Sequence, residues 1–287
     1  MPNPGATQAV TSVRNPGYVG PVFPGEASAF PMDLRALICS DSLRPFLLLA
    51  GLALALPGGA GAQSIDAARA AYSEGRFADA ARIAAALGTS DGYALAARTL
   101  AVHGHFFAPA DRRTGLLEEA TALAGKAVRA DPGNPEAHLR LAQAIGRHAQ
   151  AIGAFEAAEQ GYAEKIREAL ETALRLDPGS ATAHAALGRW HAGMIAAMGS
   201  FLARITFGAR ERDALAHFDE ALKRGPGRKA VNLECALGLL TLDGEKYRDR
   251  ARGLLVRAIA IPARDAHGRI FHRRAVDRLA ALGAEGG

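Results

Sequence analysis

The sequence predicts an all-α fold in which helices pair into hairpins from residue 63 to residue 287. Alanine, leucine, arginine and glutamate dominate this part of the chain at helical spacing, whereas the β-branched residues that favour strands are scattered. One apolar motif also recurs along the chain, and most copies are followed by a proline, which indicates repeated helical units. Hydrophobic residues make up 49% of the sequence, a fraction that excludes a disordered chain.

The recurring motif has small or apolar residues at spacings of four and three, which places them on one stripe of a helix. Alanine on this stripe lets a neighbouring helix approach closely. The copies with their prolines are Ala120, Ala124, Ala127 and Pro132; Ile166, Leu170, Ala173 and Pro178; Ala214, Phe218, Ala221 and Pro226; and Ala251, Leu255, Ala258 and Pro262, with a weaker copy at Ala80, Ala84 and Leu87. Asp-Pro-Gly at 131–133 and at 177–179 is expected to end two of these helices, with glycine supplying the turn conformation.

The helix before some of these copies carries a second pattern. The positions of W-x2-L-G-x2-Y, the first-helix signature of the tetratricopeptide repeat (TPR), are occupied by His184, Leu187, Gly188 and His191. The same positions upstream hold His138, Leu141, Ala142 and Ile145. The two patterns together resemble a TPR array, so we expect a TPR-like solenoid of about five helix pairs over residues 64–282. Gly188 and Ala173 are predicted to lie at close helix contacts.

Two of the helix pairs are predicted to be lengthened. Pro132 and Pro178 are 46 residues apart and Pro178 and Pro226 are 48 apart, so 12 and 14 residues are inserted relative to a repeat of about 34. The first insert follows Ile145 and the second follows His191. Both inserts must leave the stacking faces of the solenoid intact.

The second insert is expected to prolong its helix by several turns before the Phe-Gly turn at 207–208. Its apolar stripe consists of Met194, Met198, Phe201 and Ile205. A helix that runs past its partner leaves such a stripe uncovered. We expect the stripe to bury against Ile152 and Phe155 of the first insert, or against a ligand or partner. Any residual groove between the inserts would be flanked by Arg147 and Arg189.

Four consecutive segments carry a closer resemblance. They are GYAEKIREALETALRLDP (161–178), HAALGRW (184–190), FLARITFG (201–208) and ALAHFDEALKRGPG (214–227). Their succession is similar to the regulator of microtubule dynamics family, over roughly residues 130–265. The resemblance implies a TPR-like helical fold and a binding role. The family name implies microtubule association for eukaryotic members, and we do not expect that partner for an exported chain.

The N-terminal part of the chain has the layout of a secretory signal. Arg35 and Arg44 precede an apolar run at 45–56, and small residues follow up to Ala62, where we expect cleavage. Met32 is then the true start. The expected division of the chain is a disordered extension (1–31), a signal peptide (32–62) and a TPR-like domain in the periplasm or outside the cell (63–287). The alternative is a transmembrane anchor, which requires about 20 apolar residues.

No residue pattern points to catalysis, a cofactor or a metal. His184 and His191 lie two turns apart on one helix face and would need a third ligand such as His138, but these histidines occupy packing positions. Cys235 lies in an apolar stretch and is expected to be a buried, inert thiol. The formal net charge of +5 is too dilute for nucleic-acid binding. We therefore expect a non-catalytic protein without a transmembrane segment in its mature form.

Two function classes remain. The first is a scaffold that binds a protein or peptide partner through the concave face of the repeat. The second is a binder of an apolar small ligand, such as a lipid, between the inserted helices. The expected concave positions are too apolar to grip a terminal carboxylate: Leu139, Gln143, Ala185 and Arg189. The candidate binding residues are Arg147, Tyr162, Lys165, Arg189, Met194, Met198 and Phe201, whose alternative role is packing and solvation of the longer helices. The sequence leaves the oligomeric state open.

Overall fold

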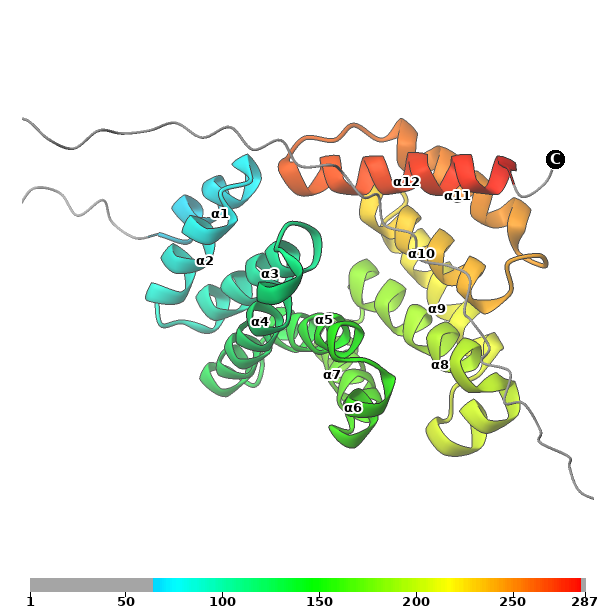
Figure 1. Cartoon of the computed structure of the whole chain (residues 1–287), viewed down its shortest axis with the longest axis horizontal. Coiled ribbons are helices and arrows are strands. Elements are labelled where there is room, and N and C mark those ends of the chain that lie inside the picture. The colour runs from blue at the N-terminus through cyan, green and yellow to red at the C-terminus, as the bar shows by residue number, and fades with distance from the viewer. Residues whose placement is uncertain (1–63, 285–287) are drawn as a thin grey trace, which may run out of the picture. The chain divides into compact units, whose positions relative to one another are not determined.

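Five helical hairpins and a final helix follow one another along the described part of the chain (Figure 1). The computed structural model describes residues 64–284, so the predicted extension and signal peptide lie outside the described residues. The hairpins are α1 (Ile65–Glu74) with α2 (Phe77–Ala86), α3 (Ser90–Phe106) with α4 (Ala110–Ala130), α5 (Pro135–Ile152) with α7 (Tyr162–Leu176), α8 (Ala181–Phe207) with α9 (Glu211–Arg224), and α10 (Lys229–Leu242) with α11 (Arg248–Ala260). The short α6 (Ala154–Glu159) connects α5 to α7, and α12 (Ala266–Ala284) ends the described part. The predicted all-α, TPR-like solenoid of about five helix pairs is confirmed.

Polar side chains mark where several helices begin and end. The side chains of Ser64, Thr89 and Ser180 each accept a hydrogen bond from a backbone N–H of the following first turn. In the two Asp-Pro-Gly turns, the carboxylate of Asp131 or Asp177 accepts a bond of 2.9 Å from the glycine N–H two residues later. Neither of these glycines has a positive φ. The aspartate and the proline therefore set the turn, and the expected role of glycine is wrong.

The recurring small residues form the contact stripe of the second helix of each pair, as predicted. The side chains of Ala120, Ala124, Ala127, Ala214, Phe218, Ala221, Ala251, Leu255 and Ala258 are all fully buried. The Phe218 ring lies between two glycines of neighbouring helices: a Cβ on Gly188 of α8 would lie 2.6 Å from its Cε1, and a Cβ on Gly238 of α10 would lie 2.7 Å from the same atom. Gly188 is thus a close contact point, and Ala173, 1% exposed, lies in the core with α8.

The inserts lengthen α5 and α8 as predicted, but they do not bury each other. α6 packs on α5 and α7, whereas α8 packs on α7, α9 and α10. Phe155 of the first insert is 79% exposed, and Phe201 and Ile205 of the second are 64% and 60% exposed. The expected burial of the apolar stripe against the first insert is therefore wrong.

A break in α8 explains the difference. α8 spans 27 residues, and within it Gly199 has a φ of 80° and a ψ of 158°, a conformation that only glycine adopts readily. Met194 and Met198, before the break, pack partly into the core formed with α7. Phe201 and Ile205, after the break, are left facing solvent.

Within residues 64–284, a single helix that is both long and apolar enough to cross a membrane is not found. By length and composition alone, α8 and α9 would meet that criterion as a pair, with a bend of 94° between them.

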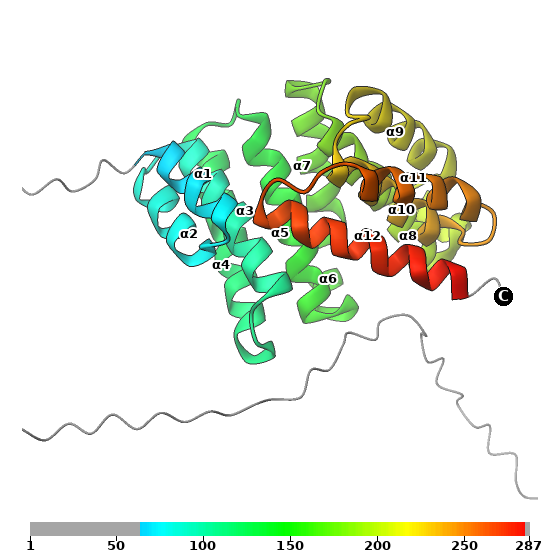
Figure 2. The same ribbon diagram turned by 90° about the horizontal axis from the view of Figure 1, so that it is seen from above.

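The last helix reaches back to the first hairpin. α12 packs on α10 and α11, and it also contacts α1 (Figure 2). Ala266 and Ile270, near its start, join Tyr72, Phe77 and Val102 in one buried cluster. α12 therefore brings the first and last repeats of the array together.

Candidate functional site

Arginines from the first helices of successive hairpins converge with α12 on one face of the array. We call this set the inner-face arginines: Arg98 of α3, Arg140 and Arg147 of α5, Arg189 of α8 and Arg274 of α12. The charges of four of them act on the ring of His267 in α12, and three of them act on Glu234 in α10. Helices far apart in sequence thus build one cationic neighbourhood.

Carboxylates pair with only some of these arginines. Glu234 lies 2.8 Å from Arg189 and 3.5 Å from Arg274, between Oε and Nη1 atoms. Glu136 lies 2.5 Å from Nη2 of Arg140. The five arginines therefore exceed these two glutamates by three positive charges.

Arg98 and Arg147 have neutral neighbours instead. Arg98 lies 3.4 Å from Nδ1 of His267, and its guanidinium stands 4.6 Å from the centre of the Tyr72 ring. Arg147 donates to the backbone oxygen of Ala101 at 3.2 Å and stands 5.2 Å from the centre of the Phe106 ring. Both residues are half-buried. Each arginine makes one hydrogen bond of this kind, so an incoming anion would replace little of its existing hydrogen bonding.

The electrostatics of this face are those of a low-dielectric cationic site. Burial and the nearby guanidiniums together lower the pKa of His267 to about 2. Burial likewise lowers the pKa of His105 to about 4, assisted by Arg147 and Arg274. Although burial opposes its ionisation, Arg189 and its neighbours hold the pKa of Glu234 below the ordinary value. Both histidines are therefore neutral at physiological pH, and the site's charge comes from arginine and glutamate.

Three buried polar atoms at the junction of α12 with the first repeats have no hydrogen-bond partner. They are the Tyr72 hydroxyl, Nε of Arg98 and Nε2 of His267. Buried polar groups are normally paired, and an unpaired one costs about 1–3 kcal/mol. The contact between α12 and the first repeats therefore leaves polar atoms without hydrogen bonds. Apolar burial around Ile270 is what stabilises it.

The motifs quoted for the family resemblance have structural roles at the joint of α7 and α8. The Trp190 indole N–H donates to the backbone oxygen of Ala163 at 2.9 Å. Nη1 of Arg167 donates to the backbone oxygen of Phe207 at 2.9 Å, just before Gly208, whose φ of 70° ends α8. These contacts hold the far end of α8 onto α7.

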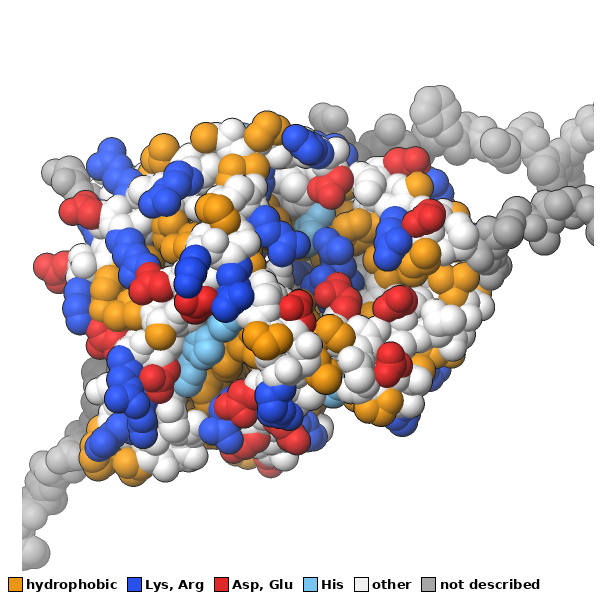
Figure 3. Space-filling view, turned by 180° about the vertical axis from the view of Figure 1, so that it is seen from behind, with side chains coloured by type: hydrophobic (Ala, Val, Ile, Leu, Met, Phe, Trp, Pro, Cys, Tyr) orange, Lys and Arg blue, Asp and Glu red, His pale blue; other side chains and the backbone are white. Residues whose placement is uncertain are grey.

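The histidines of α8 form a cluster with α9, and Figure 3 shows histidine side chains together at the surface of the molecule. Nδ1 of His184 lies 3.0 Å from Nδ1 of His217, and the ring of His217 stacks on that of His191 with centres 5.8 Å apart. The neighbour of His184 is thus His217, and His138 instead contacts the backbone oxygen of Pro132. No group of side chains suited to holding a metal ion occurs among the described residues.

Comparison with known proteins identifies the family. The model of the family described as "Regulator of microtubule dynamics protein 1-3" matches residues 93–283. The chain belongs to this family. No curated protein matches the chain. Among solved structures, TTC0263, a thermophilic TPR protein of Thermus thermophilus, has a TM-score of 0.51 and 19% identity, and the match covers 74% of this chain and 96% of that chain. YrrB, a TPR protein with an unusual peptide-binding site, has a TM-score of 0.37 and 16% identity, and the match covers 74% and 90%.

Within this regulator-of-microtubule-dynamics fold, the predicted binding residues do not form one site. Arg147 and Arg189 come together around Glu234 on the inner face. Tyr162 is buried at the start of α7, where its hydroxyl lies 3.0 Å from Nδ1 of His148, and Lys165 stands over its ring. Of the others, Met194 and Met198 are partly buried and Phe201 is exposed on α8.

The prediction that Leu139 and Ala185 lie on the concave face is wrong. Leu139 and Ala185 are 3% and 2% exposed, so they belong to the core and do not line the face. Sequence reasoning missed Arg98, Arg140 and Arg274. Arg140 could have been found from the sequence, because it lies two residues after His138 on the first helix of the third pair. The contribution of α12 had no such signal, because it arises from a contact with the other end of the array.

Proposed function

We propose that this family member is an exported, non-catalytic scaffold that binds an acidic segment of a partner protein along the inner-face arginines. The observation that carries the proposal is the excess of arginine over glutamate on a face built by first helices and α12. Helical-repeat proteins present extended binding surfaces on this side of the array. Carboxylates are the protein groups that arginine forks recognise best, through paired charge-assisted hydrogen bonds.

Partial burial makes these arginines suitable for recognition. Exposed ion pairs contribute only about 0–1 kcal/mol, whereas charged groups held in a half-buried setting interact more strongly. Arg98 and Arg147 are held in place by an aromatic ring and a backbone or imidazole acceptor, so they lose little freedom on binding. An acidic segment would complete their pairing.

A non-catalytic role is supported by the burial of Cys235. Cys235 is fully buried, and burial raises the pKa of its thiol to about 12, so the reactive thiolate is scarce at neutral pH. This agrees with the sequence-based expectation of an inert thiol.

Export is proposed from the signal-like segment at 32–62, with the mature protein beginning at Gln63 in the periplasm or outside the cell. N-terminal sequencing of the protein recovered from the producing cells tests this. A product that retains residues 1–31 would contradict both the start at Met32 and the cleavage after Ala62.

The binding proposal is tested with a fluorescein-labelled octaglutamate peptide in an anisotropy titration. We expect binding that weakens with added salt, because screening reduces interactions between exposed charges. Arg147→Gln combined with Arg189→Gln should weaken it about tenfold or more. The matched control is Arg252→Gln with Arg257→Gln, two exposed arginines of α11. Equal loss in both double variants would show that only net charge matters and would reject the inner face as the site.

A lipid-like ligand is the alternative function, and the exposed Phe201, Leu202 and Ile205 on α8 are what would favour it. Mass spectrometry of an organic extract of the purified protein distinguishes the two. A lipid present at near one equivalent, lost in Phe201→Asp, would replace the proposal.

A further inference from the structure

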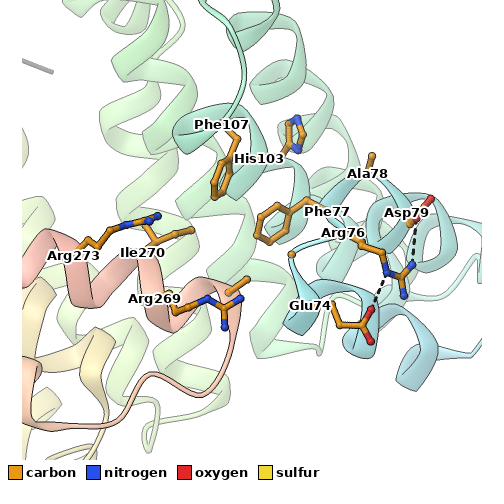
Figure 4. A pocket seen from close by; sticks show the side chains of 12 residues that line it. Glu74, Arg76, Phe77, Ala78, Asp79, His103, Phe107, Arg269, Ile270 and Arg273 are labelled. Atoms are coloured by element: carbon orange, nitrogen blue, oxygen red, sulfur yellow. Dashed lines mark hydrogen bonds and ion pairs between the residues drawn. The ribbon is translucent and has the colours of Figure 1, made fainter. Parts of the chain in front are cut away.

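A separate pocket lies where the first hairpin meets α12, and its lining combines aromatic rings with unpaired cations (Figure 4). The cavity measures about 580 Å³, within the range of small-molecule sites, which is about 300–1,000 Å³. Its walls come from α1, α2, α3 and α12. We call it the seam pocket, after the seam between the two ends of the array.

One wall of the seam pocket is aromatic. The rings of Phe77 and Phe107 have centres 5.2 Å apart, and the imidazole of His103 lies 6.3 Å from Phe77. Figure 4 shows these three side chains grouped on one side of the pocket, with Ile270 opposite. Phe107 is 49% exposed, a large apolar surface open to the cavity. This wall suits an apolar or aromatic body.

The charged groups of the pocket divide into a paired set and a free set. Arg76 lies 2.8 Å from Glu74 and 3.2 Å from Asp79, so these three charges satisfy one another on the side of the first hairpin. Arg269 and Arg273 lie one turn apart on α12 and are exposed, and their guanidiniums form no ion pair or hydrogen bond with any described residue. The unpaired charge of the seam pocket is therefore positive and lies beside the aromatic wall.

We infer that the seam pocket binds a small organic anion: an apolar or aromatic body packs on Phe107 at the aromatic wall, and its carboxylate pairs with Arg269 and Arg273. Two arginines one turn apart on a helix can share one carboxylate through several N–H donors. The same chemistry is offered by the C-terminal residue of a peptide and by a free aliphatic acid. This site is distinct from the inner-face arginines, and it stands whether or not they bind an acidic segment.

Isothermal titration of the purified protein tests the inference with two probes. N-acetyl-L-phenylalanine represents a peptide C-terminus and dodecanoate represents an aliphatic acid, and the tighter binder identifies the source. N-acetyl-L-phenylalanine amide, which has the same body without the charge, should bind at least about tenfold more weakly than the acid. Failure of both acids to bind at millimolar concentration would overturn the inference.

Matched variants locate the binding. Arg269→Glu with Arg273→Glu should weaken the acids about tenfold or more, while Arg252→Glu with Arg257→Glu, the same charge change on α11, should leave them unchanged. Phe107→Ala should weaken them as well, because it removes half-exposed aromatic surface from the wall. Each variant is first compared with the parent by circular dichroism. Equal affinities for the two double variants, or for acid and amide, would overturn the site. Octaglutamate binding should be unaffected by Phe107→Ala, so failure here is distinguishable from failure of the proposed function.

Discussion

The packing of Phe218 between two glycines gives the sharpest prediction about stability. Gly188→Ala would place a Cβ 2.6 and 2.7 Å from two ring carbons of Phe218 and 3.1 Å from the backbone oxygen of Ala214. Ordinary van der Waals contacts lie at about 3.4–4 Å, so the ring would have to move by several tenths of an ångström. Gly238 approaches the same ring from α10, and Gly238→Ala would place a Cβ 2.7 Å from Cε1. The ring is fully buried, so it has no open space into which it could move.

The expected cost follows from two opposing effects. Alanine in a helix interior is more favourable than glycine by about 1 kcal/mol. Overpacking of a tight core costs about 1–3 kcal/mol, and this cost outweighs the gain from alanine when neither neighbouring helix can move. We therefore expect Gly188→Ala and Gly238→Ala each to lower the free energy of unfolding, measured by urea denaturation with circular dichroism at 222 nm.

Gly253 provides the matched control, because it lies inside α11 and a Cβ there would meet nothing within 4 Å. Gly253→Ala should raise the free energy of unfolding by about 0.4–1 kcal/mol. In a Phe218→Leu background, the smaller side chain should relieve Gly188→Ala, with a coupling of about 0.5–3 kcal/mol. The reasoning is refuted if all three glycine variants gain stability alike, or if the double variant shows no coupling.

Three further predictions concern titration, the second insert and the thiol. His267 stays neutral in the folded protein, with a pKa of about 2, whereas its pKa in the unfolded chain is about 6.5. Its contribution to stability is therefore complete above pH 6.5 and falls as the pH drops, with a loss of about 1–2 kcal/mol between pH 7 and pH 5. His267→Gln should reduce this pH dependence of the free energy of unfolding, measured by urea titrations. Phe201→Asp should change stability by less than about 0.5 kcal/mol, whereas Met198→Asp should cost about 1–3 kcal/mol. Equal effects in thermal melts would mean that the break at Gly199 does not turn Phe201 away from the core on which Met198 packs. Cys235 should resist iodoacetamide in the native protein and react in urea, and fast native labelling would contradict its burial.

The repeated fold was predictable because each hairpin repeats the same local information. Three signals each act within a few residues: spacings of four and three, a proline after most second helices, and a leucine–glycine pair in some first helices. Gly188 was predicted from such a pair. The same pair recurs at Leu237 and Gly238, and this signal would have revealed the second glycine against Phe218.

The binding face was not predictable in the same way, since it depends on contacts between distant repeats. Arg98 and His267 are 169 residues apart in sequence and meet only because α12 returns to the first hairpin. A periodic pattern describes neighbours within the array and contains no information about its two ends meeting. The prediction that the apolar stripe of α8 is buried was wrong for a local reason. The single residue Gly199 breaks a helix that the periodic pattern treats as continuous.

The position of α12 links the two proposed sites. Its arginines carry positive charge on both sides: Arg274 lies among the inner-face arginines, and Arg269 and Arg273 line the seam pocket. Apolar burial around Ala266 and Ile270 holds α12 in place against this like charge. An anion on either side of α12 would reduce the positive potential on the other side, so binding at one site is expected to weaken binding at the other. Titration of octaglutamate with and without saturating N-acetyl-L-phenylalanine measures this coupling, and equal affinities would show that the two sites are electrostatically independent.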